Sequence, residues 1–253
     1  MTRLHEVATG LLVATSRTDS LNTVVVVGQD GGVLVVDPGW QQDELDELAA
    51  ELADRHLRPV AGFATHAHHD HVLWHPGFGD VPRWASPDTV RIAGSHRHEI
   101  VESLGDGFRD EVLALAGRVS ALPGLDIPWF GPETDVVLHD AHIVGHSALW
   151  IAELGVLVAG DMLSDVELPL PDDSPAALAT YHAGLESLAP YARIARIVIP
   201  GHGSVATDGA ARVDADRRYL DDLAVRRPSA DARISYPGMA EVHAANLALA
   251  GSD

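Results

Sequence analysis

The stretch Thr65–His71, with the sequence THAHHDH, places four histidines and one aspartate within seven residues. Imidazole and carboxylate groups are costly to bury in an apolar core unless they are paired or bind a metal ion. The preceding run PVAGFAT, which starts at Pro59, is apolar and predicts a short buried strand. The donors therefore follow a buried strand, in the kind of loop where α/β proteins commonly carry their binding and catalytic groups.

The spacing within this stretch predicts two pairs of metal ligands. His66 and His68 lie two residues apart at the strand end, so their side chains project from the same side. Asp70 and His71 follow where the chain leaves the strand and are expected to point into a neighbouring space. Each pair would serve one ion. Alternation directs His69 away from that side, which favours a structural role for it.

Further donors are needed, because a catalytic zinc ion usually has three protein ligands and one water. The chain offers three lone candidates at strand ends or in tight loops: His146 in VGHSA, Asp161 in VLVAGDML and His202 in IVIPGHGSV. The chain has no cysteine, so histidine and carboxylate must supply the metal ligands. The same absence excludes a thiolate nucleophile and a disulfide framework.

The overall composition is that of a globular protein, with 253 residues of which 46 % are hydrophobic and 21 % are charged. A net charge of −20 predicts no nucleic-acid partner, because an acidic surface repels phosphate groups. The chain start lacks the apolar segment of a secretory signal, and no window reaches the about 18 apolar residues of a membrane span. We therefore expect a soluble cytoplasmic protein with a small-molecule substrate and no membrane partner. The sequence predicts no particular oligomeric state.

The order of strands and helices predicts one domain over residues 1–253, built from two halves in which strands precede helices. The expected elements are a hairpin over 22–39, a helix from Asp43, helices over 86–122, three short strands within 135–161, a helix from about Ser174 to Leu188, a strand before His202, and two helices after Asp208 separated near Pro228. His96 and His98 fall in an apparently helical stretch and are interpreted as surface residues.

The ordered series of H-x-H-x-D-H, a lone histidine, an aspartate after a strand and a histidine in PGHG resembles the metallo-β-lactamase superfamily of binuclear metallohydrolases. The resemblance implies an α/β fold, the four-layer αββα metallo-β-lactamase-type sandwich. It also covers VVDPG, where Asp37 matches a family aspartate that orients the metal-binding loop without binding metal itself. The alternative for Asp37 is a turn residue before Pro38.

Carried over to this chain, the resemblance implies the following ligand set: His66, His68 and His146 on one ion, Asp70, His71 and His202 on the other, and Asp161 bridging both. The implied cofactors are two Zn²⁺ ions, with Mn²⁺ or iron as alternatives. They would share an activated hydroxide, which Asp70 would orient while it shuttles a proton to the leaving group.

Two of these assignments have alternatives within the sequence. His139 and His142 lie on the same stretch as His146, which is preferred because it lies between Gly145 and Ser147, as in the family's GH[ST]. Asp161 could instead cap the N-terminus of a helix.

The resemblance implies a dinuclear zinc-dependent hydrolase, and we expect a small-molecule ester, lactone or thioester as its substrate. The net charge disfavours a nuclease. The resembling acyl-homoserine lactonases carry a tyrosine shortly after the bridging aspartate, whereas DMLSDVELPL has Ser164 and no tyrosine, which weakens the lactonase interpretation. Glyoxalase II is disfavoured because the arginines after His202 are mixed with aspartates and no lysine accompanies them. The alternatives are a β-lactamase-like amide hydrolase, an iron-dependent oxidoreductase similar to a persulfide dioxygenase, and a metal-binding domain without turnover.

Overall fold

The computed structural model describes residues 4–172, 174 and 176–251. The chain divides into two compact units. The first unit runs to Val136 and includes Ile151–Leu154, and the second consists of Val137–Trp150 and the chain from Gly155 onward. This division does not test the expectation of a single domain over 1–253, which stays a prediction. The two units are described separately below.

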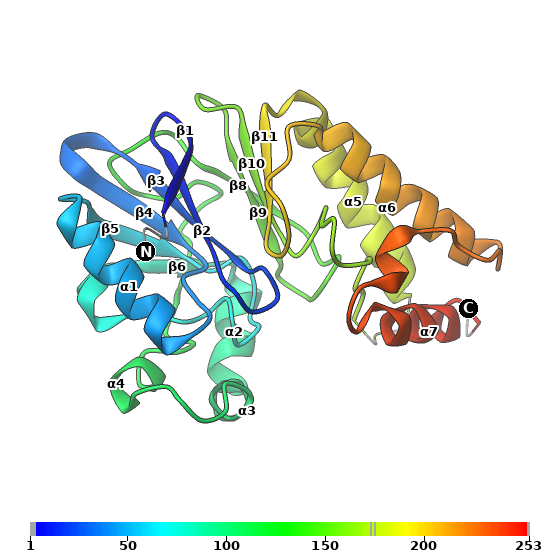
Figure 1. Cartoon of the computed structure of the whole chain (residues 1–253), viewed down its shortest axis with the longest axis horizontal. Helices are drawn as coiled ribbons and strands as arrows, with labels where there is room; N and C mark the ends of the chain where they lie inside the picture. The colour runs from blue at the N-terminus through cyan, green and yellow to red at the C-terminus, as the bar shows by residue number, and fades with distance from the viewer. Residues whose placement is uncertain (1–3, 173, 175, 252–253) are drawn as a thin grey trace. The chain divides into compact units, whose positions relative to one another are not determined.

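A seven-stranded sheet forms the first unit (Figure 1). Its strands follow one another in chain order: β1 (His5–Ala8), β2 (Leu11–Thr15), β3 (Asn22–Val27), β4 (Gly32–Val36), β5 (Arg58–Phe63), β6 (Arg83–Ala85) and β7 (Ser120–Ala121). The pairs from β1 to β4 are antiparallel, and those from β4 to β7 are parallel.

The predicted hairpin over 22–39 is confirmed as β3 and β4, joined through the short 3₁₀ turn η1 (Gln29–Gly31). Asp30 and Gly31 adopt positive φ angles of 52° and 73°. Aspartate and glycine are among the residues that tolerate this left-handed region, so the local sequence explains why the chain reverses here.

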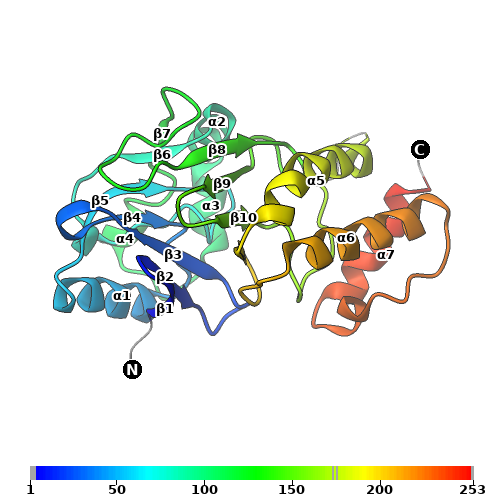
Figure 2. The same ribbon diagram turned by 90° about the horizontal axis from the view of Figure 1, so that it is seen from above.

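Helix α1 (Gln42–Asp54) confirms the helix predicted from Asp43. Asp43 and Glu44 lie in its first turn, where carboxylates interact favourably with the helix dipole. Its buried leucines pack in the same apolar cluster as Val33 and Val35 of β4. Figure 2 shows α1 running along the sheet.

The stretch 86–122 is less helical than predicted. It contains three short helices, α2 (Pro87–Ser95), α3 (Arg97–Ser103) and α4 (Asp110–Leu113), followed by β7. A short 3₁₀ turn, η2 (Pro76–Phe78), precedes this stretch. The side chain of Ser86 caps α2 by accepting a hydrogen bond from the backbone N–H of Thr89 at 3.1 Å. Gly105 and Gly107 then take φ angles of 66° and 114°, which no α-helix accommodates.

The second sheet has the strand order β11–β10–β9–β8, from β8 (Asp135–Leu138), β9 (Ser147–Ile151), β10 (Val156–Gly160) and β11 (Ile197–Pro200). The three strands predicted within 135–161 are therefore confirmed. Strands β10 and β11 are parallel, with Val158 opposite Ile199, so their carboxyl ends lie at the same sheet edge. Asp161 and His202 follow directly at that edge.

The second unit also contains α5 (Ala177–Ile194), α6 (Gly209–Ala224), the 3₁₀ turn η3 (Ala232–Ser235) and α7 (Met239–Leu249). Both views show α5 and α6 side by side, and Tyr181 and Leu220 belong to the apolar cluster that they share with β10 (Figures 1 and 2). The helix predicted from Ser174 starts at Ala177 instead, and position 175 of that prediction lies outside the described residues. The two helices predicted after Asp208 are confirmed as α6 and α7. Across the described ranges, no helix has the length and apolarity that crossing a membrane requires.

Candidate metal centre

The donors of the first unit lie in the loop after β5 and form two close pairs, as their spacing predicts. Nε2 of His66 lies 2.9 Å from Nδ1 of His68. Oδ2 of Asp70 lies 3.7 Å from Nε2 of His71. Ligands on one ion with metal bonds of about 2.0–2.2 Å are themselves about 3–4 Å apart, so both separations suit shared coordination.

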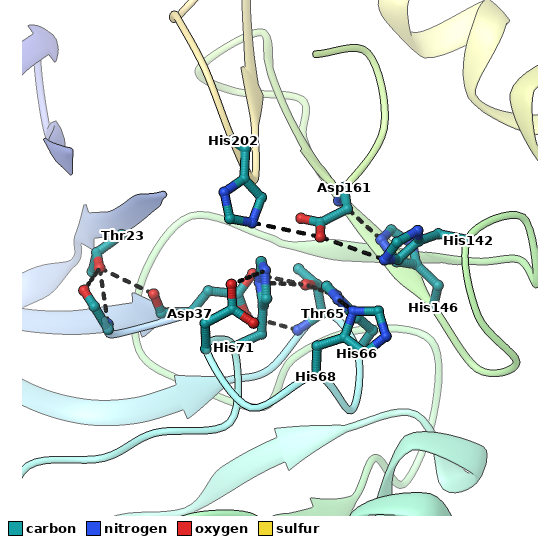
Figure 3. Close-up of polar contacts among 12 residues, drawn as sticks. Thr23, Asp37, Thr65, His66, His68, His71, His142, His146, Asp161 and His202 are labelled. Atoms are coloured by element: carbon teal, nitrogen blue, oxygen red, sulfur yellow. Dashed lines mark hydrogen bonds and ion pairs between the residues drawn. The ribbon is translucent and has the colours of Figure 1, made fainter. Parts of the chain in front are cut away.

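Asp37 directly follows β4 and lies beside Thr65 and His71 of this loop (Figure 3). Its buried carboxylate accepts hydrogen bonds from the backbone N–H of Thr65 at 2.8 Å and from the Thr65 hydroxyl at 2.7 Å. The second oxygen also lies 2.9 Å from Nδ1 of His71. A proton on Nδ1 donated to this carboxylate leaves the Nε2 lone pair of His71 available to an ion.

The hydroxyl of Thr23 in turn fixes Asp37 by donating to its backbone carbonyl at 3.0 Å (Figure 3). Asp37 has a φ angle of 48°, so it is also a turn residue, and both interpretations of this aspartate are compatible with its geometry. Its role in orienting the metal-binding loop stays a prediction, and the contact with His71 supplies a physical route for it.

His69 lies beside the second pair, with its Nδ1 3.8 Å from Oδ1 of Asp70. Its ring packs edge-on against Trp40, with 5.2 Å between ring centroids. The backbone of Gly39 comes close to the donor loop, because a Cβ atom there would lie 2.5 Å from the carbonyl oxygen of Asp70. The segment after Asp37 therefore buttresses the donor loop, and any side chain larger than hydrogen at Gly39 would displace it.

In the second unit, Asp161 lies between two imidazoles (Figure 3). Its Oδ2 atom is 3.5 Å from Nε2 of His142 and 3.6 Å from Nε2 of His202. Asp161 is buried, and no helix begins at it, so the alternative interpretation as a helix N-cap is wrong. A carboxylate oxygen placed between two imidazole nitrogens is an arrangement that a divalent ion would stabilise.

His146 has a different environment from the one predicted for it. Its Nε2 accepts a hydrogen bond from the backbone N–H of Asp161 at 3.1 Å, and its Nδ1 lies 3.2 Å from Nε2 of His139. The Nε2 lone pair is therefore engaged by the backbone. The assignment of His146 as a metal ligand stays a prediction, and the geometry of the second unit favours His142 over it.

His142 is held in a ligand-ready form by a backbone group. Its Nδ1 donates to the carbonyl oxygen of Leu170 at 2.7 Å, which leaves the Nε2 lone pair directed towards Asp161. Burial, with a smaller effect from the charge of His142, lowers the pKa of His139 to about 4, so His139 is neutral at pH 7. All three histidines lie in HDAHIVGHS, and the Gly145–Ser147 context that favours His146 in the sequence does not reveal these backbone contacts.

Glu167 is a donor that the sequence interpretation missed. One carboxylate oxygen of Asp161, one of Glu167 and one ring nitrogen of His202 all lie within 4.8 Å of one another. Glu167 lies in an irregular loop without strand or helix periodicity, so no local pattern distinguishes its position. Each unit thus carries buried or partly buried imidazoles and carboxylates, the donor types that suit zinc, manganese and iron.

Comparison with known proteins identifies the fold. The family model described as metallo-beta-lactamase superfamily matches residues 17–225. No curated protein matches the chain. Among solved structures, a beta-lactamase domain protein from Burkholderia ambifaria is 24 % identical, with 98 % of this chain and 87 % of that chain covered and a TM-score of 0.69.

Two further solved structures show the same likeness at lower identity. DIM-1 metallo-beta-lactamase exposed to ceftazidime is 17 % identical over 84 % of this chain and 96 % of that chain, with a TM-score of 0.60. The stereoselective inverting sec-alkylsulfatase Pisa1 from Pseudomonas sp. is 15 % identical over 89 % of this chain and 42 % of that chain, with a TM-score of 0.65. The expected α/β fold of the metallo-β-lactamase type is confirmed.

Proposed function

The chain belongs to the metallo-β-lactamase superfamily, and from this premise we propose that it is a dinuclear metal-dependent hydrolase of a small-molecule ester, lactone or thioester. One observation carries the proposal. The buried Asp161 carboxylate places a single oxygen 3.5 Å and 3.6 Å from the Nε2 atoms of His142 and His202. A lone carboxylate oxygen between two imidazoles is suited to joining two ions.

The proposed ligand set combines the donors of both units on the basis of family membership. His66, His68 and His142 would hold one ion, Asp70, His71 and His202 the other, and Asp161 would bridge them. His142 takes the place first assigned to His146, because the Nε2 atom of His146 already accepts a backbone hydrogen bond. Zn²⁺ is the proposed metal, with Mn²⁺ and iron as alternatives, since imidazole and carboxylate suit all three.

When bound, the ions would lower the pKa of a water molecule from about 15.7 towards about 7 and polarise the substrate carbonyl. Asp70 would orient that water and then pass a proton to the leaving group. His71 and His142 would keep their ring orientation through Asp37 and the carbonyl oxygen of Leu170. A charge of −20 favours a neutral substrate, because a highly anionic one would be repelled on approach.

The experiment is a rate survey with zinc-loaded protein on lactones, thioesters, nitrophenyl esters and β-lactams, combined with elemental analysis. We expect about two zinc ions per chain and cleavage of at least one ester-type substrate. Preferential cleavage of β-lactams would favour the amide hydrolase, and one iron per chain would favour the oxidoreductase.

His66→Ala tests the site itself, with His98→Ala as the matched control, because the His98 side chain is 93 % exposed. We expect His66→Ala to lose bound metal and all hydrolysis while His98→Ala keeps both. Parent-like turnover in His66→Ala would contradict the proposal.

A further inference from the structure

Glu167 adds a second carboxylate to the pair formed by Asp161 and His202. One donor atom from each of the three residues falls within 4.8 Å of the other two, and the Asp161–His202 separation is 3.6 Å. Ligands on one ion lie about 3–4 Å apart, so a small side-chain adjustment brings all three onto the same cation. All three residues belong to the second unit.

The loop that carries Glu167 is built so that its position is fixed. The hydroxyl of Ser164 donates to the carbonyl oxygen of His202 at 2.8 Å and accepts from the backbone N–H groups of Val166 and Glu167 at 3.1 Å and 3.0 Å. One side chain therefore ties the segment after Asp161 to the loop of His202. These contacts fix the backbone of Glu167 relative to Asp161 and His202.

A buried arginine holds the same loop from the other side. Nη1 of Arg233 donates to the carbonyl oxygens of Ser164 and Glu167 at 3.0 Å and 2.9 Å. Arg233 is only 5 % exposed, and its guanidinium is held by Asp216 at 2.6 Å and Asp231 at 2.8 Å. The backbone of Glu167 is thus anchored at both its N–H and its carbonyl group.

Two charged carboxylates this close repel each other, and a cation between them removes that repulsion. The imidazole of His202 belongs to the same group, and Arg233 contacts the backbone carbonyl of Glu167. A divalent ion held jointly by Asp161, Glu167 and His202 accounts for the arrangement.

We propose that Glu167 is an additional ligand of the ion bound by Asp161 and His202, and that it shifts this position towards harder cations such as Mn²⁺. The inference rests on the proposed function for the presence of that ion. Glu167 would add a third carboxylate to Asp70 and Asp161 at an ion that also has two imidazoles. Such a carboxylate-rich set favours hard cations more than a histidine-rich set does, because carboxylate oxygens suit Mn²⁺ while imidazole suits Zn²⁺ well.

The test is a direct metal titration of the 253-residue chain, with no need for a substrate. Mn²⁺ binding is followed by the loss of the free Mn²⁺ electron paramagnetic resonance signal, and Zn²⁺ binding by competition with a chromogenic chelator. The variants are Glu167→Gln and the charge-matched control Glu241→Gln, since Glu241 is an exposed residue of α7. Thermal melts of the metal-free proteins confirm that the variants fold.

We expect Glu167→Gln to weaken Mn²⁺ binding at one position by at least about tenfold and Zn²⁺ binding by a smaller factor, while Glu241→Gln matches the parent. Glu167→Asp, which keeps the carboxylate at shorter reach, should fall between them. Parent-like Mn²⁺ affinity in Glu167→Gln would overturn the assignment of Glu167.

The outcomes separate this inference from the proposed hydrolase. A parent protein that binds two ions but cleaves none of the test substrates refutes the hydrolase, and the titration still decides the role of Glu167. A parent protein that binds no divalent ion refutes both proposals.

Discussion

The two units supply their donors in opposite ways. The first unit places His66, His68, Asp70 and His71 in one loop of six residues after β5. The second unit gathers its donors from three loops that are far apart in sequence: His142, Asp161 with Glu167, and His202. In a short loop, the local backbone conformation determines the distances between the donors. Donors from separate loops are brought together by strand pairing and by side chains that hold each loop in place.

In both units, a hydrogen-bond partner at Nδ1 orients the imidazole of a candidate ligand. Nδ1 of His71 faces the Asp37 carboxylate, and Nδ1 of His142 donates to the carbonyl oxygen of Leu170. Both contacts leave Nε2 as the ligand atom. A carboxylate partner raises the basicity of the ring more than a neutral carbonyl does, so His71 should bind its ion more firmly than His142.

The largest expected effect tests which histidine of the second unit binds the metal ion. His142→Ala should lose at least one ion and all turnover, because it removes the imidazole next to Asp161. His146→Ala should keep both ions and lose stability instead, because it leaves the buried N–H of Asp161 without its acceptor. Elemental analysis of both variants decides the matter, and metal loss in His146→Ala alone would restore the original assignment.

Asp216→Ala tests whether the second unit needs remote support. It leaves the buried Arg233 without one of its carboxylates, and breaking a buried ion pair costs about 3–5 kcal/mol of folding stability. Denaturant unfolding of the metal-free protein measures this cost. The double variant Arg233→Met with Asp216→Leu should recover stability yet bind Mn²⁺ more weakly, because Ser164 and Glu167 lose their anchor. Unchanged Mn²⁺ affinity in the double variant would show that the loop from Ser164 to Glu167 keeps its conformation without Arg233.

Asp37→Asn tests the support of the first unit. The amide keeps the size of the side chain but removes the charge that faces His71, and loss of such an outer partner weakens metal binding by about 10–100-fold. Zinc titration with a competing chelator measures the change. The matched variant Asp30→Asn lies in the β3–β4 turn and should bind zinc like the parent. Parent-like zinc affinity in Asp37→Asn would remove this residue from the proposed site.

The smallest effect is expected at a solvent-exposed ion pair of the first unit. The hydrogen bond from Arg109 lowers the pKa of Asp46 below its usual value of 3.8. The charged form is favoured in the folded state, so the stabilisation is present above about pH 4 and is lost as the pH falls through the lowered pKa. Asp46→Asn should lower the melting temperature at pH 7 by less than about 3 °C, since exposed pairs contribute little. A larger shift would mean that this pair is as important as the one between Arg233 and Asp216.

The sequence predicted the elements whose signals are local. The β3–β4 hairpin follows from two β-branched runs around QDGG, and α1 follows from its leucine spacing and acidic first turn. The stretch 86–122 was predicted to be more helical than it is, because glycines at positive φ interrupt it and β7 pairs with β6. Pairing with a distant strand overrides the helical preference of a short segment.

The sequence by itself determined the family pattern and the paired donors of Thr65–His71, because strand alternation and a tight loop fix neighbouring side chains over a few residues. Only the tertiary structure distinguished the surroundings of His139, His142 and His146 and brought Glu167 beside Asp161. The physical reason is that the groups which contact His142, His146 and Glu167 lie far away along the chain. The Leu170 carbonyl, the Asp161 N–H and the Arg233 guanidinium are 28, 15 and 66 residues from them.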